Sequence, residues 1–271
     1  MLIVGELINA SRKEVARAIE SSDAGLIKRL ALKQVEAGAR YIDVNAGIFV
    51  GREAQYLQWL VEQVQESVDL PCCLDSPDPH AIEAALAVHK GIAMINSISL
   101  EKDRLTSLLP LLTGSDLKVV ALCMSDEGMP ETAADRVAIA DRLIDLLVQN
   151  RVPLENIYVD PLVQPVSAGG TYGWEFLHAI REIMARFPGV HTICGLSNIS
   201  YGLPVRKLLN RTFVVMAVAA GLDSVIIDPL DKQMMAGIIS AETLTGRDSY
   251  CSSYLKAYRG RRFDFTGTPP D

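Results

Sequence analysis

The chain has 271 residues, 49% of them apolar, and its formal net charge is −7. A chain of this size can bury a large core without disulfide or metal support, and its acidic balance is poorly suited to a phosphate backbone, so we expect no nucleic-acid partner. No run of about 18 apolar residues and no basic leader is present, so we expect no membrane association. The five cysteines form no CxxC pair and are interpreted as buried, reduced thiols, which predicts a cytoplasmic protein.

Eight short apolar runs, each ending in polar or small residues, recur along the chain. Continuous apolar runs of this length are typical of strands that are buried on both faces of a parallel sheet. In chain order, strands are predicted at 2–7, 40–47, 71–76, 92–97, 118–124, 156–161, 191–198 and 223–229.

The stretches between these runs carry apolar residues at helical spacing. Ser22 and Asp23 are candidate caps for a helix that ends at Gly38, and further helices are predicted at about 78–88, 132–150 and 204–220. This alternation predicts an α/β protein with a single (β/α)8 TIM barrel over residues 1–258 and a C-terminal tail at 259–271. An open doubly wound sheet is the competitor, but GELINAS after the first run lacks the GxGxxG pattern typical of that fold.

The active site of such a barrel lies at the C-terminal ends of its strands. Carboxylates and carboxamides dominate the predicted strand ends, which carry Glu6, Asn9, Asp43, Asn45, Asp75, Asn96, Met124, Asp160, Ser197, Asn198 and Asp228. No lysine or arginine ends a strand, which argues against a phosphate site or a Schiff-base enzyme. The histidines lie away from these ends, so we expect no bound metal.

A ring of aspartate and asparagine suits a flat heterocycle rich in N–H donors and carbonyls, and a pterin is such a molecule. For Asp43 and Asp228, capping of the following helix and a role in binding are equally open. Asp160 and Asp228 each precede a proline, so turn geometry is a second explanation for both. Asn96 ends the apolar run IAMI, where a polar side chain needs a partner.

Several longer segments carry a family resemblance in order along the chain. They are GELIN (5–9), DVNAG (43–47), CLDS (73–76), AMINS (93–97), YVDPL (158–162), GLSNIS (195–200), NRTF (210–213) and YCSSYLK (250–256). Through them the chain resembles the pterin-binding methyltransferases that act with a corrinoid protein, a family with a dihydropteroate synthase-like barrel. The resemblance covers nearly all of the chain except the tail.

The resemblance implies a substrate, tetrahydrofolate or 5-methyltetrahydrofolate, and a set of site residues. Asp75, Asn96 and Asp160 would hold the pterin edge. Asn198 would lie near N5 of the folate and would be catalytic together with Asp75 and Asp160. The other folate contacts would be Glu6, Met124, Gly195, Ser197 and Arg206. Tyr201 and Gly202 stand where the family usually has a polar residue, so contacts from that loop depart from the pattern.

The implied reaction is methyl transfer between N5 of tetrahydrofolate and the cobalt of a corrinoid. The chain lacks the DxHxxG cobalamin motif, so cobalamin is expected on a separate corrinoid protein, and related enzymes imply a homodimer. We expect transfer from a methylcorrinoid to tetrahydrofolate, as in catabolic demethylation, for example of glycine betaine. The alternative is a methyltetrahydrofolate:corrinoid/iron–sulfur protein methyltransferase of the acetyl-CoA pathway.

Two other functions compete with methyl transfer. Dihydropteroate synthases share the barrel, but they carry an NxTPDSF-like first loop and a basic GxSRK-like segment, where this chain has ELINASRK and GLSNIS. A folate-binding barrel without catalytic activity is the other alternative, because a fold by itself does not decide the chemistry.

Overall fold

The computed structural model describes residues 1–264, and within them eight parallel strands form one sheet in the order β7–β6–β5–β4–β3–β2–β1–β8. The strands are β1 (Leu2–Asn9), β2 (Tyr41–Asn45), β3 (Cys72–Asp75), β4 (Met94–Leu100), β5 (Lys118–Ser125), β6 (Ile157–Asp160), β7 (His191–Thr192) and β8 (Ser224–Ile227). The backbone N–H of Ile226 donates to the carbonyl of Cys194 (2.9 Å), which joins β8 to the segment after β7. The sheet therefore closes into the predicted barrel, although β7 is far shorter than the expected 191–198.

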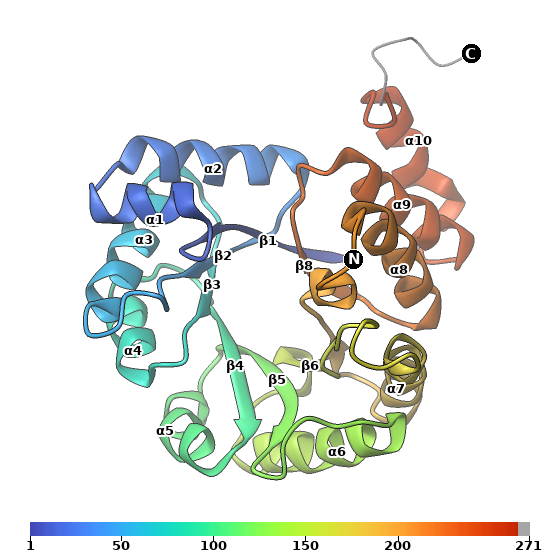
Figure 1. Ribbon diagram of the computed structural model, residues 1–271, viewed down its shortest axis with the longest axis horizontal. Coiled ribbons are helices and arrows are strands. Elements are labelled where there is room, and N and C mark those ends of the chain that lie inside the picture. Colours follow the sequence, from blue (N-terminus) through green and yellow to red (C-terminus); the bar gives the residue numbers. More distant parts are fainter. Residues whose placement is uncertain (265–271) are drawn as a thin grey trace.

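Helices surround the strands (Figure 1). The α-helices are α1 (Lys13–Glu20), α2 (Ala24–Ala37), α3 (Glu53–Ser67), α4 (Pro79–Val88), α5 (Lys102–Leu112), α6 (Ala133–Gln149), α7 (Tyr172–Arg186), α8 (Arg206–Ala220), α9 (Lys232–Leu244) and α10 (Ser252–Arg259), and the 3-10 helices are η1 (Leu154–Asn156), η2 (Leu196–Ser200) and η3 (Ser249–Cys251). The predicted helices correspond to α2, α4, α6 and α8, whereas α1 was not predicted.

Local sequence explains where these helices begin and end. Asp23 accepts a hydrogen bond from the backbone of Leu26 (3.1 Å) and so caps α2, which ends at Gly38 in a left-handed conformation (φ 112°). Thr132 and Asp135 form a reciprocal capping box at the start of α6. The caps of α2 and α6 thus lie close to the predicted positions.

One layer of side chains fills the inside of the barrel, and each of the eight positions around the barrel contributes one residue to it. This layer consists of Val4, Tyr41, Cys73, Met94, Val120, Tyr158, Ile193 and Ile226. Alternate residues of a strand face the same side, so the residues two positions later point into the barrel as well, one layer nearer its C-terminal mouth. The other buried apolar side chains pack in the two larger clusters that involve the helices.

A polar and aromatic floor closes the N-terminal end of the barrel. Lys118 donates to the hydroxyl of Tyr158 (2.9 Å) and lies over the rings of Tyr158 and Tyr41. The His191 ring stacks on Tyr158, and its Nδ1 lies 2.7 Å from Asp223 Oδ2. His191 therefore lies at the end opposite the mouth, as expected from its place at the start of a strand.

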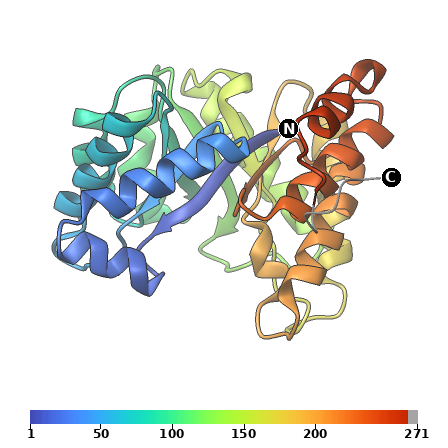
Figure 2. The same cartoon turned by 90° about the horizontal axis from the view of Figure 1, so that it is seen from above.

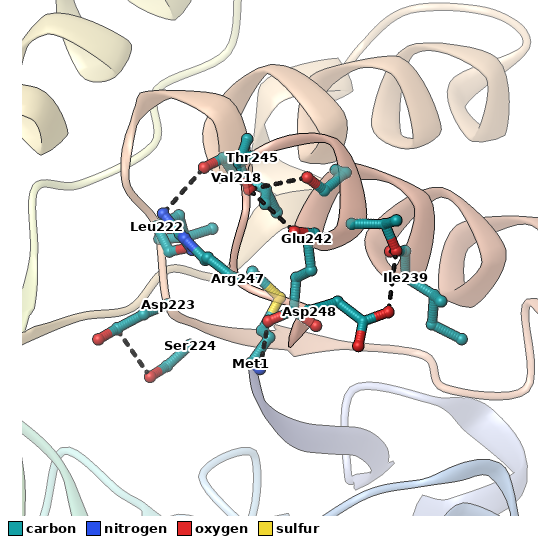
Figure 3. Close-up of polar contacts among 12 residues, drawn as sticks. Met1, Val218, Leu222, Asp223, Ser224, Ile239, Glu242, Thr245, Arg247 and Asp248 are labelled. Carbon is teal, nitrogen blue, oxygen red and sulfur yellow. Dashed lines mark hydrogen bonds and ion pairs between the residues drawn. The ribbon is translucent and has the colours of Figure 1, made fainter. Parts of the chain in front are cut away.

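The C-terminal helices are anchored to the start of the chain and to the end of α8. Figures 1 and 2 both show the N-terminus beside the C-terminal helices, and the ammonium group of Met1 contacts Glu242 on α9. In Figure 3, Arg247 follows α9 and donates to the carbonyls of Leu222 (2.6 Å) and Val218 (3.0 Å). The tail predicted at 259–271 begins at Arg259, the last residue of α10, and its residues 265–271 lie outside the described residues.

None of the helices within residues 1–264 has the length and apolar character needed to cross a membrane. Of the five cysteines, Cys251 is exposed and the other four are buried, so the interpretation as buried thiols is wrong for Cys251. That residue lies in η3, outside the strands of the barrel.

Candidate active site

A ring of inward-facing positions surrounds the mouth of the barrel, and each position lies two residues after a residue of the buried interior layer. Its members are Glu6, Asp43, Asp75, Asn96, Leu122, Asp160, Gly195 and Asp228. Strand periodicity places them here: each follows a buried interior residue by one pleat repeat. The structure thus brings together five of the nine predicted site residues, Glu6, Asp75, Asn96, Asp160 and Gly195, in one layer.

The ends of β2, β3 and β4 form a connected polar cluster. Asp75 pairs with Asn96 in the register of β3 and β4. Asn45 Nδ2 donates to Asp75 Oδ2 (2.9 Å), and Asn96 Nδ2 lies 3.5 Å from Asp43 Oδ1. Within residues 1–264, Oδ1 of Asp75 and Oδ1 of Asn96 accept no hydrogen bond. These two oxygens are therefore available to bind the N–H groups of a ligand.

Burial shapes the charges of this cluster. Burial raises the pKa of Asp75, while the hydrogen bond from Asn45 and the nearby Arg104 guanidinium oppose that change. Burial raises the pKa of Asp43 well above its ordinary value, and the neighbouring Asp75 carboxylate adds to the effect. Asp43 is therefore a buried member of the ring, and the helix that follows it, α3, begins after Arg52. Of the two explanations left open by the sequence, capping of the following helix is wrong, and a role in binding stays a prediction.

Asp160 lies across the barrel at the end of β6 and is 8% exposed. Its Oδ1 accepts a hydrogen bond from the backbone of Leu162 (2.8 Å). Burial raises its pKa to about 7, although backbone hydrogen bonds from Leu162 and Gly195 and the charge of Arg136 all oppose this. A carboxyl with this pKa changes its charge near neutral pH, which suits a group that exchanges protons during a reaction.

Arg136, a fully buried arginine on α6, fixes the loop after Asp160. Its Nε donates to the carbonyl of Pro161 (2.8 Å) and its Nη2 to Gln164 Oε1 (2.8 Å). Its Nη1 donates to the carbonyls of Glu131 (2.8 Å) and Thr132 (3.0 Å). Because these donors are paired, the charge can be buried beside the site without an unsatisfied group.

Glu6 on β1 is a second carboxyl with a pKa near neutrality. Burial raises its pKa to about 7; the charge of Arg12 lowers it, Asp228 raises it, and Arg206 lowers it. Arg12 Nη2 lies 3.5 Å from Glu6 Oε1. Asp228 accepts a hydrogen bond from the backbone of Leu230 (2.9 Å), which is turn geometry, while α9 is capped by Asp231.

The segment after β7 carries the remaining predicted polar residues. Ser197 and Asn198 lie in η2 and not at the end of a strand as predicted, because the chain turns into this 3-10 helix at Leu196. Asn198 is exposed. Arg206, also exposed, donates from Nη2 to the carbonyl of Ser197 (2.7 Å) and from Nε to Ser200 Oγ (3.0 Å), so it braces this segment from the start of α8.

One side of the mouth is apolar. Val119, Ala121 and Cys123 of β5 pack outward against the helices, so the alternation turns Leu122 and Met124 inward. Both are partly exposed. Met124 was predicted from the sequence, whereas Leu122 was missed because an apolar residue inside an apolar run gives no separate signal. These two side chains give the site a surface against which a flat ring can pack.

Within the described residues, no three histidine, cysteine, aspartate or glutamate side chains gather as ligands around a metal would. Nothing in the sequence pattern indicated Arg104 or Arg136, because both act on the site through backbone carbonyls far away in the chain.

Comparison with known proteins places the chain in one family. The family described as pterin binding enzyme matches residues 5–228. A methylcorrinoid:tetrahydrofolate methyltransferase of Eubacterium limosum is 36% identical over 261 residues, which cover 96% of each chain. A methionine synthase of Mycobacterium tuberculosis is 33% identical over 241 residues, covering 84% of this chain but 20% of the longer protein.

Solved structures with this fold include dihydropteroate synthases. The enzyme from Coxiella burnetii in complex with pteroic acid has a TM-score of 0.68 at 16% identity and covers 91% of this chain and 94% of that chain. The enzyme from Thermus thermophilus has a TM-score of 0.63 at 20% identity and covers 87% of this chain and 91% of that chain. At these identities the likeness shows the shared barrel fold and says nothing of a shared reaction.

Proposed function

The chain belongs to the pterin binding enzymes, and from this premise we propose that it transfers a methyl group between the cobalt of a corrinoid protein and N5 of tetrahydrofolate. The observation that carries the proposal is the ring at the barrel mouth, where Asp75 and Asn96 each keep an oxygen without a partner among the described residues. The identity to a methylcorrinoid:tetrahydrofolate methyltransferase along 96% of both chains supports the same chemistry here.

We assign the pterin edge to Asp75, Asn96 and Asp160. Adjacent N–H donors on that edge match carboxylate oxygens, and the amide of Asn96 supplies both a donor and an acceptor. Leu122 and Met124 offer the apolar surface beside them. A pterin held with all its polar groups paired would be fixed in one orientation, and positioning of this kind supplies much of an enzyme's rate.

The corrinoid, when bound on its own protein, supplies a methyl group that is open to nucleophilic attack and retains the electron pair of the broken bond. The lone pair of N5 attacks this methyl group, and N5 then loses its proton. Asn198 is the group we assign to stabilise N5 by hydrogen bonding, with no acid–base role of its own. The carboxylate of Asp160, with a pKa of about 7, is suited to accept this proton, directly or through water.

The partner and the direction are part of the proposal. The relative from Eubacterium limosum is named for a methylcorrinoid and tetrahydrofolate, which supports transfer toward the folate. That the reaction serves a catabolic demethylation pathway is part of our proposal. Exposed apolar side chains on the loops after β2, β5 and β7 offer a rim for the corrinoid protein: Ile48, Val50, Met129, Tyr201 and Val205. We further propose a cytoplasmic homodimer whose contact uses the exposed apolar residues of α7 and α8, among them Trp174 and Met216.

The test compares Asn198→Ala and Asp160→Ala with the unchanged protein. Each variant, supplied with a methylated corrinoid protein and tetrahydrofolate, should lose methyl transfer as followed by the cobalt absorbance, while circular dichroism shows a folded chain. Turnover at the unchanged rate in either variant would refute the residue assignment. Folate binding without any transfer by the unchanged protein would favour the non-catalytic barrel, and condensation of a pterin pyrophosphate with p-aminobenzoate would favour the synthase.

A further inference from the structure

Arg104, near the start of α5, joins the ends of β3 and β4. Its Nε donates to the carbonyl of Ser97 (2.7 Å), its Nη1 to that of Pro77 (2.6 Å) and its Nη2 to that of Ser76 (2.7 Å). Ser76 and Pro77 directly follow Asp75, and Ser97 directly follows Asn96. One planar guanidinium thus fixes both backbone segments that carry the proposed pterin ligands, with a rigid geometry that lysine does not offer.

The charge of Arg104 acts on the same site. All three acceptors are neutral carbonyls, so none of these hydrogen bonds is an ion pair. Asp75 is the carboxylate that most strongly favours the charged form of Arg104, followed by Glu101 and Glu53. In return, Arg104 lowers the pKa of Asp75 against the effect of burial. A nearby cation favours an ionised carboxylate, which is the form that accepts two N–H bonds.

We propose that Arg104 is a positioning residue for the pterin site: it holds the backbone segments of Asp75 and Asn96 side by side and places a positive charge beside the Asp75 carboxyl. This inference rests on the proposed function and extends it to a residue outside the inward-facing ring. Arg136 braces the loop after Asp160 in a comparable way, but it is fully buried. Arg104 is partly exposed and therefore better suited to substitution without loss of the fold.

Other charged groups around Asp75 set the background for a test. Asp43 on β2 and Glu53 on α3 face the same cluster, as does the thiol of Cys73 on β3 itself. Glu53 opposes ionisation of Asp75, Asp75 in turn raises the pKa of Asp43, and Arg104 is the cation that favours the charged form of Asp75. Removing this cation leaves a cluster of acidic groups whose mutual repulsion and burial both favour the protonated form.

The experiment uses Arg104→Gln and Arg104→Lys in the full chain, with Lys102→Gln on the same helix as a charge-matched control. Titration of the ligand-free protein, followed by NMR of aspartate labelled with ¹³C at Cγ, measures the pKa of Asp75, with the Asp75 signal assigned from Asp75→Asn. Calorimetry with 5-methyltetrahydrofolate near neutral pH measures Kd. Urea unfolding shows that each variant is folded.

The glutamine variant should raise the pKa of Asp75, because the nearby cation is lost, and should weaken folate binding about tenfold. The lysine variant should keep that pKa near its original value but weaken binding, because it keeps the charge and loses the three-point geometry. The control should change neither quantity. An unchanged Asp75 pKa in the glutamine variant, or unchanged Kd in both variants, would overturn the inference. Absence of folate binding by the unchanged protein would instead refute the proposed function.

Discussion

Substitution of Asp160 by asparagine should stabilise the protein while removing its function. The pKa of Asp160 rises from 3.8 to about 7 on folding because of burial, so the folded state is favoured when the carboxyl is protonated. This stabilising contribution is lost as the pH rises from about 4 to about 7. The difference of about 3 units corresponds to about 4 kcal/mol above pH 7. Asparagine does not titrate and avoids this penalty, but it loses one backbone hydrogen bond, which costs about 1 kcal/mol.

Urea unfolding at about pH 5 and about pH 8 measures this effect. We expect Asp160→Asn to gain about 3 kcal/mol at the higher pH and less than about 1 kcal/mol at the lower pH, where less than half of the penalty has developed and the lost hydrogen bond offsets most of it. The matched control is Asp116→Asn, which changes a solvent-accessible aspartate before β5. Equal effects at the two pH values, or a loss of stability at the higher pH, would show that burial does not set the charge of Asp160. Folate binding by the variant should fall at least about tenfold.

Two further predictions concern the first strand and the rim. In Gly5→Ala the new methyl group would lie 2.9 Å from Cδ of the buried Gln34, so we expect urea unfolding to show a loss of about 3 kcal/mol in the free energy of unfolding, largely relieved by adding Gln34→Ala. Gly170→Ala, where the added methyl group meets open space, is the control. Strictly additive effects of Gly5→Ala and Gln34→Ala would contradict the clash. Val50→Glu at the rim should raise KM for the corrinoid protein about tenfold without changing the rate of methyl transfer from free methylcobalamin. The control, Tyr250→Glu, should change neither this KM nor this rate. A loss of transfer from both methyl donors in Val50→Glu would exclude a docking role for Val50.

The barrel could be predicted from the sequence because its strands and helices differ in local pattern. Each strand is a short apolar run that ends in a polar residue at the mouth, which is why Asp75, Asn96 and Asp160 could be placed at strand ends by position. Their assignment to the pterin edge came from the family resemblance and stays a prediction. β7 was overestimated because its apolar run continues into loop and 3-10 helix. α1 was missed because Arg12 gives it no side-chain cap, so no start signal precedes it.

The side chains that hold the site in place could not be predicted, because they act through contacts between residues distant in the chain. Arg104 reaches carbonyls 27 and 28 residues away, and Arg136 reaches Pro161 25 residues away. Gln34 inserts its side chain beside β1, where it accepts from the backbone of Leu7 (3.0 Å). A polar residue on a helix usually faces solvent, so nothing in the local pattern marks these three as inward-facing.

The floor of Lys118, Tyr158 and His191 has a kinetic consequence. Among the described residues these side chains pack across the N-terminal end of the barrel. In the proposed function, folate therefore enters at the mouth, where the corrinoid protein is also proposed to dock. The proposal predicts a compulsory order, in which tetrahydrofolate binds before the corrinoid protein and excess corrinoid protein inhibits by covering the mouth of the empty site.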